Sequence, residues 1–285
     1  MIDYLKVKGR LLLLALTVVW ATSFPFTKIA VEAIGYAYYV AFRLVMASIP
    51  MLLYGVLRLD FKAIRICLEP GITLSILFLL GIALQGLGMS YTSASNAAFI
   101  TSLNVVFVYL IEIYYGRSSL DSRIISAICL AILGVYLLSS TDTITFNPGD
   151  IIVLIAAFVW ALQIVYVGVS SRRFAPSNLL FLEITLSSAG SIPLILLQPP
   201  PNIHLILTSL PYIAYLALAC TVLANTLQLY GQKIVGNVEA SIIYMMEPVF
   251  AAIFAYIAIG EYPALKQLAG SIAIMTSLAL TIRKS

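Results

Sequence analysis

Residues 71–91 read GITLSILFLLGIALQGLGMSY. The stretch contains no charged residue, and its few polar side chains are those of serine, threonine, glutamine and tyrosine. A helix needs about 20 mostly apolar residues to cross the roughly 30 Å hydrocarbon core of a bilayer. The stretch therefore predicts one transmembrane helix.

Similar stretches recur along the chain, separated by short connections. They are continuous apolar runs rather than alternating strands, so the pattern favours helices over a closed barrel. We therefore predict an all-α integral membrane protein with ten transmembrane helices. The other nine predicted spans are 11–31, 36–57, 95–115, 122–139, 151–168, 178–197, 209–231, 238–259 and 265–282.

The composition indicates the same class of protein. Of 285 residues, 62% are hydrophobic and 10% are charged, whereas soluble domains carry about 25% charged residues. Basic residues precede the first apolar run, as in a signal peptide, but that run is too long for one. We therefore expect a retained first helix.

The sequence offers little for metal or cofactor chemistry. Its three cysteines, Cys67, Cys129 and Cys220, lie in apolar stretches without paired spacing, and His204 is the only histidine. No Walker-type glycine loop occurs. We expect no metal, no cofactor and no nucleic-acid partner; the expected partners are the lipid bilayer and a small organic solute.

Basic residues mark one side of the predicted topology, because cytoplasmic loops of membrane proteins are enriched in Lys and Arg. The opposite side has Lys266 and, at the end of the first helix, Lys28. We expect a multi-pass protein of the cell membrane with both termini in the cytoplasm. The residues on the basic side are Lys6, Lys8, Arg10, Arg58, Lys62, Arg65, Arg117, Arg123, Arg172, Arg173, Lys233, Arg283 and Lys284.

The two halves of the chain resemble each other at an offset of 143 residues. Leu84-Gln85 matches Leu227-Gln228, and Asn104 matches Glu247. We predict one five-helix repeat in 1–140 and a second in 148–285. An odd number of helices inverts the second repeat, and such pairs bind their solute near the midplane, between the repeats. This arrangement predicts a central cavity and transport by alternating access.

Several segments resemble the EamA-type branch of the drug/metabolite transporter superfamily. The resemblance implies a ten-helix transporter with a central cavity, exporting or importing amino acids, other metabolites or drugs. The proline before Val249-Phe250 has no counterpart in the first half, which reads Val105-Val106-Phe107, so the sequence leaves open whether both halves bend alike. The segments are Trp20 to Lys28, Arg43, Ser95 to Phe107, and Glu247-Pro248-Val249-Phe250 through Gly260-Glu261.

Polar groups at membrane depth suggest the cavity residues, because a charge at the centre of a helix costs roughly 2.5–3.5 kcal/mol on insertion. Glu247 precedes Pro248, which removes a backbone hydrogen bond. One hypothesis is that Glu247 binds a substrate ammonium or carries a coupling proton. The alternative is a hydrogen bond between helices. The predicted cavity residues are Trp20, Arg43, Thr101, Asn104, Trp160, Gln163, Tyr244 and Glu247.

Some of these residues have other interpretations. The tryptophans wall a cavity or pack against small residues. Arg43 could hold a substrate carboxylate, pair with Glu32 or extend to the membrane surface, and we favour a structural or gating role inside the bundle. Gln85, Asn225 and Gln228 are explained by hydrogen bonds between helices. Glu112 and Glu183 are expected to form interfacial ion pairs with arginines.

We predict a secondary transporter that moves a small organic solute, an amino acid or related metabolite, with export favoured. The alternative is an integral membrane enzyme acting on lipid-soluble substrates, but its acidic or histidine cluster is not evident. Nothing resembles a channel filter. No GxxxG-type face specifies a dimer, so we expect a monomer or a weak homodimer.

Overall fold

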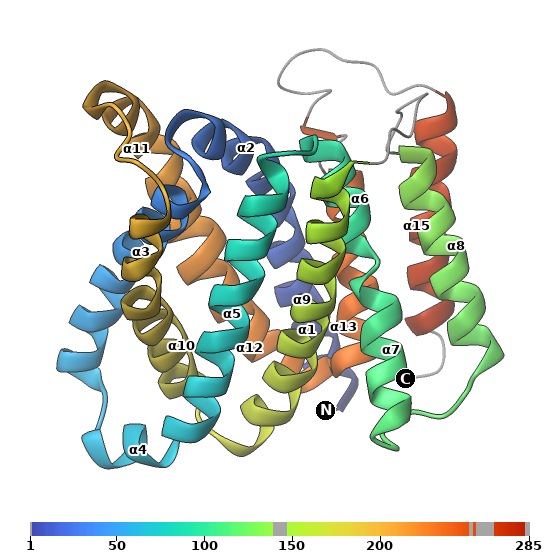
Figure 1. Cartoon of the computed structure of the whole chain (residues 1–285). Coiled ribbons are helices and arrows are strands. Elements are labelled where there is room, and N and C mark those ends of the chain that lie inside the picture. Colours follow the sequence, from blue (N-terminus) through green and yellow to red (C-terminus); the bar gives the residue numbers. More distant parts are fainter. Residues whose placement is uncertain (1, 139–146, 251–252, 255–264, 283–285) are drawn as a thin grey trace.

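The computed structural model describes residues 2–138, 147–250, 253–254 and 265–282, and every regular element among them is a helix (Figure 1). The elements are α1 (Ile2–Ala21), α2 (Ser23–Ile34), α3 (Tyr36–Arg58), α4 (Phe61–Ile66), α5 (Leu68–Met89), α6 (Ala94–Ser102), α7 (Asn104–Tyr114), α8 (Ser122–Leu138), α9 (Pro148–Arg173), α10 (Pro176–Ser191), the 3-10 helix η1 (Ile192–Leu197), α11 (Ile203–Ala217), the π-helix η2 (Leu218–Leu223), α12 (Ala224–Val235), α13 (Asn237–Tyr244) and α15 (Leu265–Ile282).

Seven helical stretches among these residues are long and apolar enough to cross a membrane. Two shorter apolar helices, α8 and α15, correspond to the predicted spans 122–139 and 265–282. The predicted span 238–259 lies partly outside the described residues, so the count of ten remains a prediction. The seven stretches are Tyr4–Ile34, Tyr36–Arg58, Leu68–Met89, Asn96–Tyr114, Pro148–Arg173, Pro176–Leu197 and Ile203–Val235.

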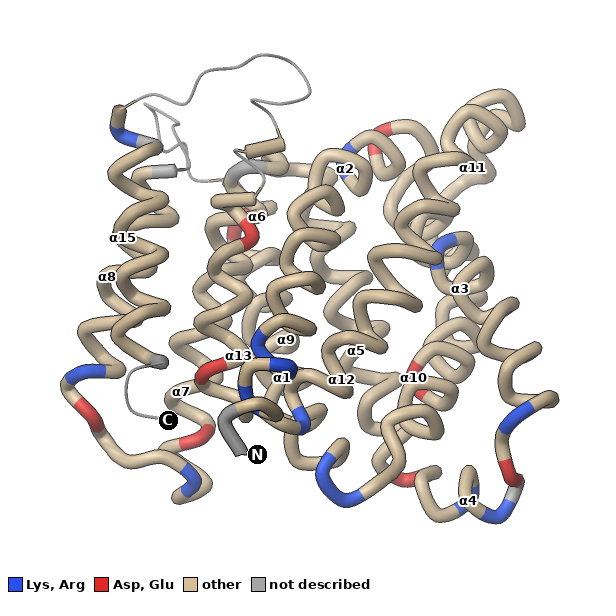
Figure 2. The backbone as a smooth tube through the Cα atoms, turned by 180° about the vertical axis from the view of Figure 1, so that it is seen from behind, with Lys and Arg blue, Asp and Glu red and all other residues tan. Residues whose placement is uncertain are grey.

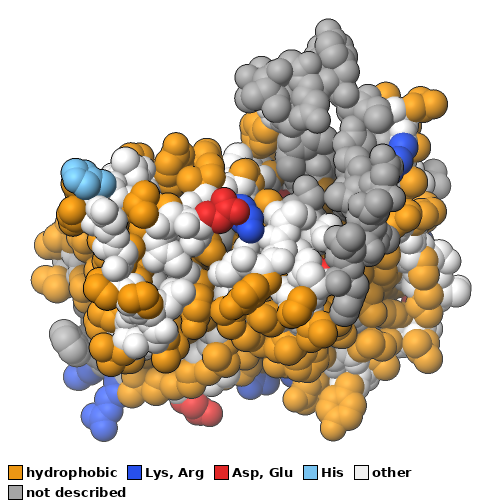
Figure 3. Space-filling view, turned by 45° about the horizontal axis from the view of Figure 1, so that its top comes forward, with side chains coloured by type: hydrophobic (Ala, Val, Ile, Leu, Met, Phe, Trp, Pro, Cys, Tyr) orange, Lys and Arg blue, Asp and Glu red, His pale blue; other side chains and the backbone are white. Residues whose placement is uncertain are grey.

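Basic residues gather at one end of the bundle, where α1 begins and α15 ends (Figures 1 and 2). We call this end the basic face. It includes the end of α3, all of α4 and the last turn of α9, which ends in Arg172 and Arg173. Figure 3 turns the opposite end forward, and the described surface there is mostly hydrophobic or uncharged. This asymmetry matches the basic side predicted from the sequence.

Two helix pairs pack by close backbone approach at glycines. A Cβ on Gly88 of α5 would lie 3.0 Å from the carbonyl oxygen of Gly149 in α9. In the same way, a Cβ on Gly231 of α12 would lie 3.1 Å from the carbonyl oxygen of Gly9 in α1. Any larger residue would separate these backbones. Each pair joins a helix of one predicted repeat to the first helix of the other.

Several of the apolar stretches are interrupted. Thr22 separates α1 from α2, Leu103 separates α6 from α7, and Met245-Met246 follows α13 before the helix resumes at Glu247. The predicted spans 11–31, 95–115 and 238–259 are thus each interrupted within their described parts. Leu103 and Met245 have nearly equal backbone angles, φ −66° with ψ −9° and −7°. The first half thus bends without a proline.

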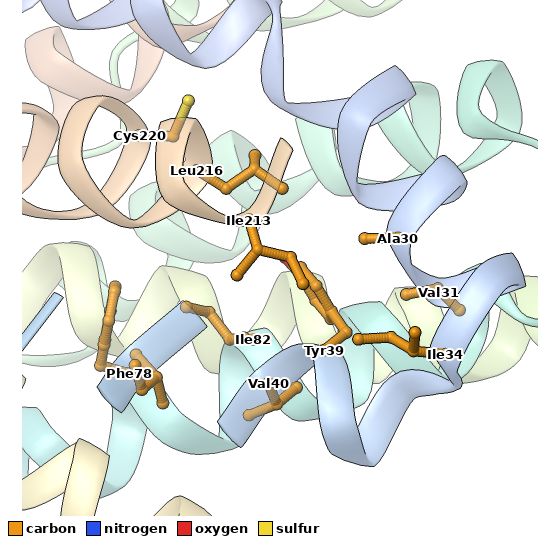
Figure 4. Packing of buried hydrophobic residues seen from close by; sticks show 11 residues of the cluster. Ala30, Val31, Ile34, Tyr39, Val40, Phe78, Ile82, Ile213, Leu216 and Cys220 are labelled. Atoms are coloured by element: carbon orange, nitrogen blue, oxygen red, sulfur yellow. The ribbon is translucent and has the colours of Figure 1, made fainter. Parts of the chain in front are cut away.

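Helices α2, α3, α5 and α11 pack together through a hydrophobic cluster (Figure 4). Tyr39 of α3 lies at its centre, 1% exposed, between Ile34 and Ile213. The Tyr39 hydroxyl is hydrogen-bonded to Thr27 at 3.1 Å and accepts a hydrogen bond from Arg43. The cluster therefore ends at a polar edge, where the central cavity begins.

Candidate functional site

The interrupted helices surround a cavity with a volume of about 80 Å³. Each interruption supplies lining residues on both of its sides. Trp20 and Ser23 flank the break between α1 and α2, and Ser102 and Asn104 flank the break at Leu103. Discontinuous helices line the binding sites of many transporters, because a break exposes backbone and polar side chains at membrane depth.

The cavity brings all of the predicted site residues together. Trp20, Arg43, Thr101, Asn104, Trp160, Gln163, Tyr244 and Glu247 line it, and so do Gln85 and Asn225. Other lining residues were not predicted as cavity residues. They are Ser23, Phe24, Thr27, Phe78, Ile82, Ser102, Ile164, Cys220 and Met245. These residues are small, weakly polar or apolar, so they stand out from other membrane residues only through their position.

Glu247 places a carboxyl group on the cavity wall. It is the first residue after the break at Met245-Met246. No hydrogen bond or ion pair joins its side chain to any residue that the structure describes. A carboxylate at membrane depth is costly unless a cation, a proton or several hydrogen bonds accompany it. The group is therefore ready for a cationic or protonated partner from the cavity.

Arg43 contributes a guanidinium group to the same cavity, where it is 7% exposed. Its Nε donates to Thr221 Oγ1 at 2.9 Å, its Nη1 to the Tyr39 hydroxyl at 2.5 Å and its Nη2 to the Cys220 carbonyl at 3.3 Å. It forms an ion pair with no described carboxylate, because Glu32 pairs instead with Lys28 at 3.2 Å. The Arg43 charge is thus oriented by neutral oxygens and is not neutralised by them.

Aromatic side chains form much of the remaining wall. Trp20 packs edge-on against Tyr244 with ring centroids 5.4 Å apart, and its indole Nε1 donates to the Cys220 carbonyl at 3.3 Å. Trp160 packs edge-on against Phe78 at 5.7 Å. Both tryptophans line the cavity, and the Trp160 ring also packs against a small residue, Gly81 of α5.

Besides Glu247, two polar side chains of the wall are buried without a hydrogen-bond partner among the described residues. The amide oxygen and nitrogen of Asn225 and the hydroxyl of Thr101 are buried without a hydrogen bond to any described residue. Buried polar groups are almost always hydrogen-bonded, and each exception needs an explanation. A polar molecule in the cavity would satisfy these groups.

Glu183 of α10 lies behind the cavity wall, and the predicted interfacial ion pair is wrong for it. Its side chain is fully buried, and its Oε1 accepts a hydrogen bond from Gln163 Nε2 at 2.9 Å. Gln163 also exchanges hydrogen bonds with Gln228 at 3.1 and 3.3 Å. Glu112, by contrast, does pair with Arg117, at 3.4 Å. Helix periodicity alone did not distinguish the two positions.

A polar layer separates the cavity from the basic face. The Tyr244 hydroxyl donates to Gln232 Oε1 at 3.0 Å, Gln232 Nε2 donates to Asn237 Oδ1 at 2.8 Å, and Asn237 Nδ2 donates to Glu112 Oε1 at 3.0 Å. Gln232 also bonds the carbonyl of Ile164. These bonds connect α7, α9, α12 and α13 in one polar layer.

The described residues hold no group of three His, Cys, Asp or Glu side chains with the proximity of metal ligands. The cavity lining combines aromatic rings, amide groups, one guanidinium group and one carboxyl group. A family model described as the EamA-like transporter family matches residues 7–140 and again residues 147–283. The chain belongs to the EamA-like transporter family. It is accordingly a multi-pass membrane protein, and its overall helical architecture agrees with this membership.

Relatives of this EamA-like chain are described as transporters. A protein of Archaeoglobus fulgidus named "Uncharacterized transporter" is 28% identical over 92% of this chain and 82% of its own length. The "Uncharacterized transporter YdfC" of Bacillus subtilis is 26% identical over 93% of this chain and 88% of its own length. One solved crystal structure superposes with a TM-score of 0.81 at 13% identity, covering 97% of this chain and 96% of the other, which shows a shared fold.

Proposed function

We propose that this EamA-like protein is a secondary carrier for a small organic solute, an amino acid or related metabolite. It moves the solute across the cell membrane by alternating access, with export favoured and both termini in the cytoplasm. The cavity lined by Trp20, Arg43, Thr101, Asn104, Trp160, Gln163, Tyr244 and Glu247 is the proposed binding site. The observation that supports the proposal is that the Arg43 guanidinium and the Glu247 carboxyl group line the same cavity, each without an ion-pair partner among the described residues.

The charges support a zwitterionic solute. Glu247 has no described partner, and Arg43 is surrounded by neutral oxygens. A solute with an ammonium and a carboxylate would compensate both groups, and guanidinium–carboxylate bonds are among the strongest in proteins. The aromatic rings would enclose its apolar part, while Asn225 and Thr101 would bind its remaining polar atoms.

The helix packing supports alternating access. The glycine contacts Gly88–Gly149 and Gly9–Gly231 repeat the same arrangement in both halves, with each half holding the first helix of the other. The polar layer below Tyr244 closes one end of the cavity. A movement between the halves that opened this layer would connect the cavity to the basic face.

Counterflow in reconstituted vesicles tests the proposal. Vesicles preloaded with one of three unlabelled amino acids, L-leucine, L-phenylalanine or L-threonine, would take up the tritiated form of the same compound. Saturable uptake that depends on preloading indicates a carrier. Chemical conversion of the label would identify an enzyme instead, and absence of counterflow with every amino acid tested would reject this substrate class.

The variant Glu247→Gln tests whether this cavity residue binds the solute. Loss of one charge-assisted interaction would raise the half-saturation concentration roughly tenfold or more. The matched control is Glu69→Gln, because Glu69 is exposed in the first turn of α5 and lines no described cavity. Equal effects of the two variants would contradict a substrate role for Glu247.

A further inference from the structure

A second cavity lies at the basic face and shares no lining residue with the central one. Its volume is about 590 Å³. Four arginines line it, Arg117 after α7, Arg123 in the first turn of α8, and Arg172 and Arg173 at the end of α9. We call it the basic pocket. Four guanidinium groups around one hollow suggest a ligand with several negatively charged oxygens.

The acidic residues of the basic pocket, Glu112, Asp121 and Glu239, compensate part of this charge. Glu112 is paired with Arg117 at 3.4 Å, and Glu239 is paired with Arg10, which lies outside the pocket lining. The Asp121 carboxylate accepts the backbone N–H of Arg123 at 2.9 Å, which leaves the Arg123 guanidinium unused by this bond.

Three arginines of the pocket are therefore available to a ligand. Among the residues that the structure describes, no carboxylate forms an ion pair with Arg123, Arg172 or Arg173. Arg172 and Arg173 are exposed, and Arg123 is half-buried. The turn at Gly236 helps to place them, because its φ of +100° favours glycine and a Cβ there would lie 3.2 Å from Arg172 Nη2.

The pocket is also amphipathic. Beside the arginines, its lining includes Ile124 of α8, Val238 of α13 and Leu280 of α15. Helices α8 and α15 pack against each other at one edge of the bundle (Figure 1), and the Ser277 hydroxyl donates to the Ala127 carbonyl at 2.7 Å between them. A hollow bordered by a peripheral helix pair is within reach of the surrounding lipid.

We infer that the basic pocket binds the phosphate of an anionic phospholipid. The guanidinium groups of Arg123, Arg172 and Arg173 hold the phosphate oxygens, and the apolar residues accommodate the beginning of an acyl chain. Basic pockets between transmembrane helices on the cytoplasmic side are suited to such head groups, since Lys and Arg side chains near the surface attract anionic lipids. Inorganic phosphate presents the same chemistry without the chain, so the test must separate the two sources.

Native mass spectrometry of the full-length protein released from detergent tests the inference. The probes are phosphatidylglycerol, phosphatidylcholine of equal chain length, and inorganic phosphate. The wild type should retain phosphatidylglycerol in preference to phosphatidylcholine. The triple variant R123Q/R172Q/R173Q should bind phosphatidylglycerol roughly tenfold or more weakly.

The control is R58Q/K62Q/R65Q, which removes the same charge from the same face but touches no residue of the pocket. It should retain phosphatidylglycerol as the wild type does. Equal losses in the two triple variants would overturn the inference in favour of diffuse attraction. Equal retention of the two lipids, or phosphate binding without lipid preference, would overturn the lipid assignment. R123K/R172K/R173K, which keeps the charge, should recover part of the binding and guards against a folding defect.

Discussion

Arg10 of α1 donates to Glu239 of α13 across 2.5 Å, and this ion pair joins the two predicted repeats at the basic face. The side chains are 18% and 9% exposed, so water screens the pair little. The Arg10–Glu239 pair and the Asn237–Glu112 bond at 3.0 Å together stabilise the polar layer between the central cavity and the basic face. In the proposed alternating access, a movement that separated the two repeats at the basic face would break this pair.

Arg10→Gln should make the cavity more accessible from the basic face. Cys220 lines the cavity and is 1% exposed, so it reports on opening. In a background with Cys67 and Cys129 replaced by Ser, a membrane-impermeant maleimide should label Cys220 about tenfold faster, which corresponds to ~1.4 kcal/mol in the opening equilibrium. The charge-exchanged variant R10E/E239R should return toward the slow rate. Unchanged labelling in Arg10→Gln would contradict a closing role for the pair.

Arg43→Lys should lower stability as well as solute binding. A lysine ammonium cannot reproduce the planar fork that reaches Thr221, Tyr39 and the Cys220 carbonyl at once. We expect the melting temperature in detergent to fall by roughly 3–6 °C. Arg58→Lys, at the exposed end of the same helix, is the control and should change it little. A stable Arg43→Lys protein would show that these bonds contribute little.

Gly81→Ala should narrow the cavity by displacing Trp160. A Cβ on Gly81 would lie 2.8–2.9 Å from the Trp160 ring, whereas a Cβ on Gly86 would meet Tyr39 at an ordinary 3.4 Å. The chain has two tryptophans, so Trp20→Phe leaves Trp160 as the only indole emitter. In that background, Gly81→Ala should shift the fluorescence maximum and Gly86→Ala should not. Identical spectra would show that the ring adjusts without moving.

Gln163→Leu should destabilise the protein by removing the described partner of the buried Glu183 carboxyl. A buried polar group that loses its hydrogen bond costs about 1–3 kcal/mol, so the melting temperature should fall by roughly 2–6 °C. The double variant Q163L/E183L should be more stable than Q163L, because it removes both polar partners together. If the double variant is the less stable one, Glu183 has a further stabilising contact.

Much of the cavity could be predicted because charge and amide groups are rare at membrane depth. Asn104, Glu247 and Arg43 stand out in apolar sequence for this reason, and the offset between the halves paired the first two. The break at Leu103 could not be predicted, because no proline or glycine lies beside it. The break at Met245-Met246 does have a sequence signal, because Pro248 follows it and lacks a backbone N–H.

The hydrogen-bond partners of the polar residues could not be predicted either. Arg43 bonds the Cys220 carbonyl, a backbone atom far along the chain that no residue pattern identifies. Glu183 was assigned to the interface because it lies near a helix end, although its contact with Gln163 lies inside the bundle. Sequence position gives depth along a helix, but the packing of several helices decides which way a side chain faces.

The glycine contact between α1 and α12 also determines when the protein can assemble. Gly9 leaves the ribosome well before Gly231, by about 10–45 s at ordinary rates of synthesis. During that interval, α1 is in the membrane without α12, the helix whose Gly231 packs closely against Gly9. A bulky residue at Gly9 or Gly231 would therefore reduce the yield of inserted protein. Transport measured with the molecules that did fold would reveal little about the mechanism of solute transport.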